Sequence, residues 1–299
     1  MADGLWAFEA YQAVRGRLPQ ARFGGPPVRA ATLEAVAAPF DLILLDAYGV
    51  LNVGETPIEG AADRIAALRR AGKAVMVVSN SAGYPKRMMM QRYARLGFDF
   101  TEAEVTTSRE ALLHHLAGMP ARRWAMMLNP AQGMEELEAL DCAFLADDPA
   151  EYARAEGFLL IGSDGWTEAR QAMLEGALRA RPRPVLVGNP DIVAPRETGL
   201  SREPGHFAHR LAELAGVTPV FLGKPFADIF RLALSRAPAP PDPARVLMVG
   251  DTLHTDILGG RQMGFATALV TDFGALAAMD VDAAIARSGI VPDFVINRI

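Results

Sequence analysis

The stretch Asp41-Leu-Ile-Leu-Leu-Asp46-Ala-Tyr-Gly-Val-Leu51 decides the fold class of this chain. Four consecutive apolar residues run into Asp46, and Gly49 follows soon after. A short apolar run that ends at a glycine turn is typical of a buried parallel strand. A carboxylate at the carboxyl end of such a strand lies where open α/β sheets bind ligands. Because a strand followed by a capping aspartate is also common, the stretch alone predicts an α/β fold but not a catalytic role for Asp46.

Three further segments of the chain have the same form, an apolar run that ends in polar residues. They are Ala74–Val78 before Ser79-Asn80-Ser81, Pro219–Leu222 before Gly223-Lys224-Pro225, and Val246–Val249 before Gly250-Asp251-Thr252, with Asp256 one turn later. Each polar group alone fits an ordinary role, as a helix cap, a surface lysine or a solvated helix start. Four such groups at strand ends, in this order, are improbable by chance, and they predict one shared site.

This order of motifs resembles the haloacid dehalogenase (HAD) superfamily of hydrolases over about residues 40–299. Asp46 matches the nucleophile of the first motif, and Ser79 matches the hydroxyl of the second. Lys224 matches the lysine of the third motif, and Asp251 with Asp256 matches the acidic fourth motif. The four-motif set is highly specific.

The segments Gly223-Lys-Pro225, Gly250–Asp256 and Gly188-Asn-Pro-Asp191 are similar to the class IIA branch of that superfamily. This branch includes nucleotide, pyridoxal phosphate, phosphoglycolate and nitrophenyl phosphatases. The resemblance implies a doubly wound parallel-sheet HAD core with an inserted α/β cap domain. It also implies a magnesium-dependent hydrolase of small phosphomonoesters that works through an aspartyl phosphate.

The residue types suit that chemistry. A carboxylate such as Asp46 can attack phosphorus and form an acyl phosphate that water hydrolyses. Magnesium prefers oxygen ligands. If the family pattern holds, Asp46, the main-chain carbonyl of Tyr48 and Asp251 bind the ion, and Asp256 orients the metal site.

The remaining candidates are expected to hold the phosphate group and the rest of the substrate. Lys224 would place a positive charge beside the nucleophile, and Ser79 would hold phosphoryl oxygens as charge develops. Asn80, Asn189 and Arg196 lie in segments that could contact the substrate, although Asn189 also fits a turn-forming role.

Tyr48 departs from the phosphatase pattern. Phosphatases of the superfamily carry at this position a second aspartate, which protonates the leaving oxygen and then activates water. A phenol with a pKa of about 10 is a poor base at neutral pH, and losing a general acid/base typically costs about a hundred- to ten-thousandfold in rate. Asp-Ala-Tyr-Gly is similar instead to the 2-haloacid dehalogenases, which attack carbon without a metal. Two alternatives therefore stay open: a dehalogenase-like hydrolase and a non-catalytic protein that binds a phosphate ligand.

The spacing of the motifs locates an insertion. Asp46 and Ser79 are 33 residues apart, whereas Ser79 and Lys224 are 145 residues apart, which is more than a plain crossover needs. We expect a core of residues 1–84 and 192–299, in which residues 1–35 form an N-terminal extension, and a cap of residues 85–191. The runs expected to form the cap sheet are Trp124–Leu128, Cys142–Leu145, Phe158–Ile161 and Pro184–Val187.

Composition limits the class of protein. A hydrophobic fraction of 51% over 299 residues argues against disorder, and a net charge of −5 argues against nonspecific nucleic-acid binding. The single cysteine, Cys142, excludes an internal disulfide framework. No run approaches 18 apolar residues. We therefore expect a cytoplasmic protein that binds neither nucleic acid nor membrane. The family resemblance implies that its ligand is a small phosphorylated metabolite. A homodimer is compatible with the sequence.

Overall fold

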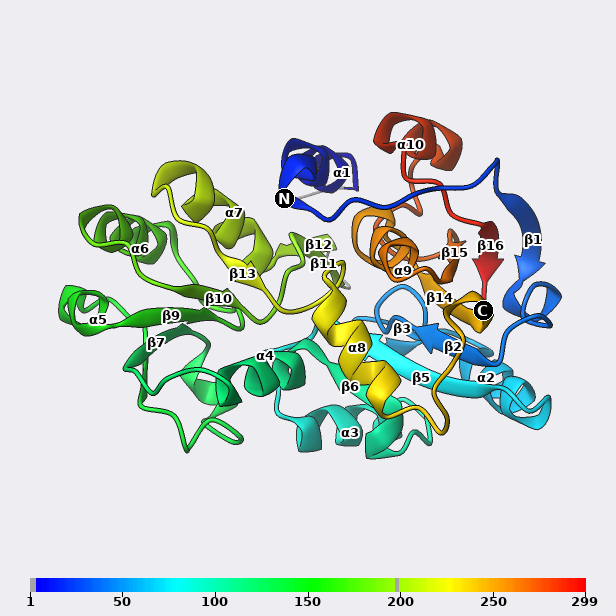
Figure 1. Cartoon of the computed structure of the whole chain (residues 1–299), viewed down its shortest axis with the longest axis horizontal. Coiled ribbons are helices and arrows are strands. Elements are labelled where there is room, and N and C mark those ends of the chain that lie inside the picture. Colours follow the sequence, from blue (N-terminus) through cyan, green and yellow to red (C-terminus); the bar gives the residue numbers. More distant parts are fainter. Residues whose placement is uncertain (1–3, 197–198) are drawn as a thin grey trace.

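A computed structural model of the chain describes residues 4–196 and 199–299, without the side chains of residues 195 and 196. Two parallel β-sheets lie toward opposite ends of its longest axis (Figure 1). The larger sheet has seven strands. In spatial order these are β1 (Val28–Thr32), β16 (Phe294–Arg298), β15 (Ala266–Val270), β14 (Val246–Gly250), β2 (Leu42–Leu45), β5 (Ala74–Ser79) and β6 (Val105–Thr107). The sequence prediction of an α/β fold with a parallel sheet is confirmed.

Helices cover both faces of this sheet, because its central strands are apolar on both sides. In β2, Ile43 and Leu45 face a core that contains residues of α2 (Ala61–Arg70) and α3 (Lys86–Arg95). Leu42 and Leu44 face the opposite core, which contains residues of α4 (Ser108–Ala117) and α8 (Ala227–Ser235). All four strand residues are buried. This alternation is what a doubly wound sheet requires, and it leaves the carboxyl ends of the strands open for a site.

The second sheet has five parallel strands. In spatial order they are β13 (Val220–Phe221), β10 (Val185–Val187), β9 (Gly157–Leu160), β7 (Trp124–Met127) and β8 (Cys142–Phe144). Its helices are α5 (Pro149–Arg154), α6 (Glu168–Ala180) and α7 (Pro204–Leu214). The four strands expected from the sequence all belong to this sheet.

The two sheets do not divide the chain at the predicted boundaries, residues 85 and 191. The strand β6 extends the seven-stranded sheet, because Val105 pairs with Val77 of β5. The strand β13 falls within the predicted core range 192–299, but it pairs with β10 of the second sheet. The motif spacing locates the insertion without fixing its ends, and the short segment Val105–Thr107 has no apolar pattern that distinguishes it. The division into a core and a cap stays a prediction.

The remaining elements join or cover the sheets. The expected N-terminal extension contributes α1 (Gly4–Ala13) and the edge strand β1. The hairpin β11 (Val193–Arg196) and β12 (Gly199–Arg202) lies between the sheets, near α1 (Figure 1). A second hairpin, β3 (Asn52–Val53) and β4 (Thr56–Pro57), follows Asp46, and α9 (Leu258–Gln262) and α10 (Val281–Ser288) complete the larger unit. None of the described helices is long and apolar enough to cross a lipid bilayer.

Candidate active site

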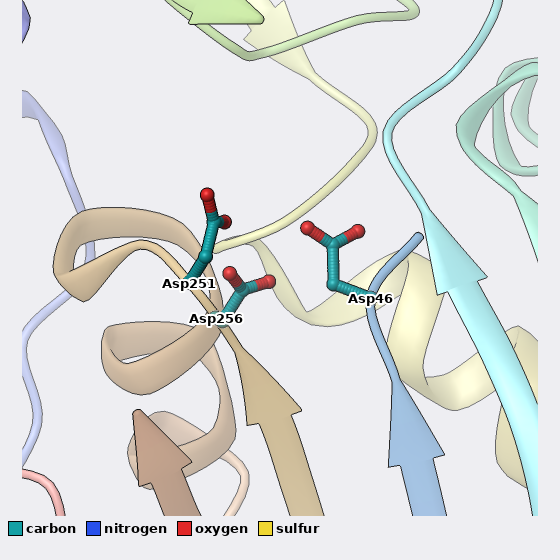
Figure 2. A group of neighbouring side chains, drawn as sticks. All are labelled: Asp46, Asp251 and Asp256. Carbon is teal, nitrogen blue, oxygen red and sulfur yellow. The ribbon is translucent and has the colours of Figure 1, made fainter. Parts of the chain in front are cut away.

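Three carboxylates meet at the carboxyl ends of two neighbouring strands. Asp46 directly follows β2, and its backbone N–H donates to the carbonyl of Val249 in β14 at 2.9 Å. Asp251 follows β14, and Asp256 lies in the π-helical turn Leu253–Ile257. One oxygen of each carboxylate lies within 4.8 Å of the others. Figure 2 shows the three side chains grouped beside the strand ends. The parallel pairing of β2 with β14 therefore brings together residues about two hundred positions apart in the sequence.

Lys224 places a cation among these carboxylates. Its side chain is buried, and Nζ lies 2.5 Å from Oδ1 of Asp46 and 2.8 Å from Oδ1 of Asp256. Burial by itself lowers the pKa of Lys224, but the charges of Asp256, Asp46 and Asp191 outweigh burial and raise it above the ordinary value. Lys224 therefore stays charged beside Asp46 at neutral pH.

Asp251 lies in a close-fitting backbone cradle. Its Oδ2 accepts from the backbone N–H of Ala275 at 2.9 Å, and its Oδ1 accepts from Oγ1 of Thr252 at 2.9 Å. Gly49 and Gly274 adopt positive φ angles of 79° and 87° beside it. A Cβ atom would stand 2.6 Å from Asp251 Oδ2 at Gly49 and 1.9 Å at Gly274. The two glycines thus allow the chain to close around this carboxylate.

The donor set fits a hard divalent cation. Burial first, and then the neighbouring carboxylates, raise the pKa of both Asp251 and Asp256, with Lys224 partly opposing the rise at Asp256. Crowded buried carboxylates of this kind are stabilised by a positive ion that accepts oxygen ligands, and Mg²⁺ is such an ion. Asp46, Asp251 and Asp256 are the residues that could hold it.

The second motif lies across from this acidic cluster. Ser79 ends β5, is buried, and accepts through Oγ from the backbone N–H of Ser81 at 3.2 Å. The amide group of Asn80 donates to Asp191 Oδ1 at 2.7 Å and to the Lys224 carbonyl at 3.0 Å, and it accepts from Lys224 N–H at 2.7 Å. Both N–H donors of the Asn80 amide are thus occupied, so this side chain positions Lys224 and leaves no free donor for the substrate.

Asn189 and Arg196 belong to the segment that links β10 to α7. Asn189 is buried, and its Nδ2 donates to Oε2 of Glu203 at 3.1 Å, while its Oδ1 accepts from the backbone N–H of Asp191 at 3.0 Å. These bonds match the turn-forming role that the sequence left open, although Asn189 also lines the cavity described below. Arg196 ends β11, and its side chain lies outside the described part of the structure.

Tyr48 lies beside the nucleophile, with a buried arginine over its ring. The guanidinium carbon of Arg92 is 4.8 Å from the ring centre of Tyr48. Arg92 also donates to Oε1 of Glu55 at 2.8 Å and to the carbonyl of Gly54. This contact between a cation and an aromatic face fixes the Tyr48 ring at the position where the phosphatase pattern has its acid/base. The predicted role of the Tyr48 carbonyl as a metal ligand stays a prediction.

A cavity of about 510 Å³ opens over these groups. The larger sheet contributes Asp46, Tyr48, Ser79 and Asp251 to its wall, and the second sheet contributes the loop Ile161–Gly165. The lining residues that sequence reasoning missed include Tyr11 of α1 and Gln132 near β7. Neither residue follows a strand in the motif pattern, and only the folded chain brings them to the site.

Comparison with known proteins identifies the family. Residues 43–143 match a family model described as haloacid dehalogenase-like hydrolase, and residues 221–299 match a HAD-hydrolase-like model. Rat chronophin is 30% identical over 281 residues, which cover 91% of this chain and 90% of chronophin. The chain belongs to the haloacid dehalogenase-like hydrolases. The HAD resemblance predicted from the four motifs is confirmed, and the protein is a hydrolase.

Two solved HAD structures share this fold. The p-nitrophenyl phosphatase of Archaeoglobus fulgidus superposes with a TM-score of 0.70 at 25% identity, covering 87% of this chain and 96% of its own. The glycerol phosphate phosphatase of Mycobacterium tuberculosis, solved in complex with calcium, superposes with a TM-score of 0.63 at 25% identity, covering 80% of this chain and 68% of its own. Both relatives are named as phosphatases of small esters, and one was solved with a divalent cation.

Proposed function

We propose that this HAD protein hydrolyses small phosphomonoesters through an aspartyl phosphate on Asp46, with Mg²⁺ bound by Asp46, Asp251 and Asp256. The observation that carries the proposal is the cluster of three carboxylates with Lys224 paired to two of them, at the floor of a polar cavity. A hydrolase that works through an aspartyl phosphate needs both a carboxylate nucleophile and enough positive charge for the phosphate dianion.

The reaction has two displacements at phosphorus. In the first, a carboxylate oxygen of Asp46 attacks phosphorus, the bond from phosphorus to the leaving oxygen breaks, and that oxygen takes a proton. In the second, water attacks the phosphorus of the acyl phosphate and loses a proton, the bond to Asp46 breaks, and inorganic phosphate leaves. The proton that water loses balances the one that the leaving oxygen took. Lys224, already 2.5 Å from Asp46, keeps the carboxylate oriented and offsets the negative charge of the incoming phosphate. A bound Mg²⁺ would supply further charge neutralisation for the transferring phosphoryl group.

The identity of the proton donor sets the leaving-group preference. The family acid/base position holds Tyr48, whose phenol is a weak acid and a poor base near pH 7. Esters that leave as a stabilised anion, such as nitrophenyl phosphate, need little protonation. We therefore expect such esters to react faster than alkyl phosphates in the native protein.

The second sheet serves in this proposal as the cap that selects the substrate. The loop Ile161–Gly165 and Gln132 line the cavity opposite the acidic cluster. Small-ligand sites are commonly built between such units, and closure over the ligand excludes water. The dehalogenase-like alternative is less well supported, because attack on carbon with halide departure has no use for three crowded carboxylates beside Lys224.

A phosphatase screen tests the proposal. Purified protein is assayed on sugar phosphates, nucleotides, pyridoxal phosphate, glycerol phosphate and nitrophenyl phosphate, with magnesium and with a chelator. We expect magnesium-dependent release of phosphate, and none from Asp46→Asn. Release of halide from a 2-haloacid without metal, or no hydrolysis of any ester, would contradict the proposal.

A further inference from the structure

The N-terminal helix α1 supplies a residue to the cavity. Tyr11 lines the same cavity as Asp46 and Asp251, although it lies on the extension that precedes the first motif. Its side chain belongs to the hydrophobic cluster that also contains Ile192 of the linking segment and Leu253 of the fourth-motif turn. Only 4% of Tyr11 is exposed, so its position is set by packing.

Aromatic contacts hold Tyr11 against the fourth motif. Its ring stacks on His254 with 5.1 Å between centres and 9° between planes, and Phe8 packs edge-on against the same imidazole at 5.5 Å. His254 Nε2 lies 2.8 Å from Oε1 of Gln12. Three residues of α1 therefore fix the turn that carries Asp256, and this contact leaves the Tyr11 ring little freedom.

Within the described part of the chain, the hydroxyl group of Tyr11 accepts one hydrogen bond and donates none. Its oxygen accepts from the backbone N–H of Ile192 at 3.1 Å. Among residues 4–196 and 199–299, it donates no hydrogen bond. Burial, and then the charge of Asp191, raise the pKa of Tyr11, so the group stays protonated. A buried donor without an acceptor is costly, and a ligand oxygen in the cavity would satisfy it.

We propose that Tyr11 contacts the substrate, with its hydroxyl group donating a hydrogen bond to an oxygen of the phosphomonoester bound in the cavity. This inference rests on the proposed phosphatase function. The acceptor is either a phosphoryl oxygen or an oxygen of the leaving group, and both are good acceptors for a phenol. In either case α1 takes part in substrate binding rather than only covering the core.

The test is Tyr11→Phe, which removes the hydroxyl and keeps the stacked ring. Tyr152→Phe is the matched control, because Tyr152 is also buried and also bonds a backbone group, the Ala146 carbonyl at 2.9 Å, but does not line the cavity. Both variants lose one buried hydrogen bond, so both should melt at a lower temperature. Only Tyr11→Phe should raise KM for the best substrate, by about tenfold or more for a bond to a charged group.

Inorganic phosphate separates the two acceptors and does not require turnover. Calorimetry gives the Kd of phosphate for the native protein and for both variants. A weaker Kd in Tyr11→Phe places the bond on a phosphoryl oxygen, whereas an unchanged Kd with a raised KM places it on the leaving group. If Tyr11→Phe lowers the melting temperature as Tyr152→Phe does but leaves both KM and Kd unchanged, Tyr11 is only structural and the inference is wrong.

Two further outcomes have defined meanings. If the native protein hydrolyses no ester, the phosphatase proposal fails. A weaker phosphate Kd in Tyr11→Phe would then still support a contact between Tyr11 and a phosphoryl oxygen, and an unchanged Kd would overturn the inference. If Tyr11→Phe does not fold, a fluorinated tyrosine at position 11 keeps the ring and strengthens the donor. It should then tighten the phosphate Kd or lower KM, and no change in either would overturn the inference.

Discussion

The ammonium nitrogen of Lys224 lies 2.5 Å from Oδ1 of Asp46. Asp46 follows a central strand of the seven-stranded sheet, and Lys224 follows β13 at the edge of the five-stranded sheet. The ion pair therefore joins the two sheets at the residue that we propose as nucleophile. Asn80 braces the same lysine from β5 through hydrogen bonds to its backbone N–H and carbonyl.

Removal of this buried cation should damage both activity and stability. In Lys224→Met, the carboxylates of Asp46 and Asp256 lose their partner inside the protein, and breaking a buried pair typically costs about 3–5 kcal/mol in the free energy of unfolding. We expect urea denaturation to show a loss of that order in the free energy of unfolding. We also expect phosphatase activity to fall close to background. Lys73→Met is the control, since the Lys73 ammonium group donates to the Ala38 carbonyl at an exposed position. Equal behaviour of the two variants would refute the role of Lys224.

The cradle around Asp251 predicts a specific effect of one methyl group. In Gly274→Ala the new Cβ would stand 1.9 Å from Asp251 Oδ2 and must displace the carboxylate. Gly289 also has a positive φ, 65°, but a Cβ atom added there would have no neighbour within 4 Å. Both variants should lose some stability from backbone strain. Only Gly274→Ala should lose the rise in melting temperature that magnesium gives the native protein by mass action. An equal magnesium response in both variants would argue against Asp251 as a ligand.

The aromatic residue at the acid/base position predicts the leaving-group dependence. Tyr48→Asp should raise activity on alkyl phosphates more than on nitrophenyl phosphate, by about tenfold or more if the new carboxylate serves as general acid. The thermal melt must be checked first, because the substitution also removes the contact between Tyr48 and Arg92. If the native protein already turns over an alkyl phosphate at an ordinary rate of about 1–10³ s⁻¹, and Tyr48→Asp brings no gain, another group supplies the proton.

Much of the site was predictable because parallel strands bring their carboxyl ends to one edge. The strand ends at Asp46, Ser79 and Asp251 lie where the apolar runs placed them. The sequence could not predict which sheet β13 joins, because a strand of two residues has no pattern that indicates its partner strand. Tyr11 was missed for a related reason: its place at the site depends on packing between α1 and the fourth-motif turn. The expected cytoplasmic location and homodimer stay predictions.

On the side of the second sheet, the cavity wall contains Gln132, and we expect this residue to influence which substrate the protein prefers. Oε1 of Gln132 is buried without a hydrogen-bond partner among the described residues, and Gln132 lines the cavity. A hydroxyl group on the substrate would satisfy this acceptor. Gln132→Leu should therefore raise KM for sugar or glycerol phosphates several-fold, about what one neutral hydrogen bond contributes, and leave nitrophenyl phosphate almost unchanged.

Gln91→Leu is the control for that substitution, since Gln91 is exposed on α3 and does not line the cavity. An unchanged substrate ranking in Gln132→Leu would show that selection lies elsewhere on the cavity wall.

The central claim is that Asp46 becomes phosphorylated during turnover. The direct measurement is an acid quench of the native protein during turnover with magnesium and its best substrate, followed by mass spectrometry of the peptide that contains Asp46. We predict one phosphoryl group on Asp46 during turnover, and neither phosphorylation nor hydrolysis in Asp46→Asn, whose thermal melt confirms the fold. Phosphate on a different residue, or near-normal hydrolysis by Asp46→Asn, would contradict the account.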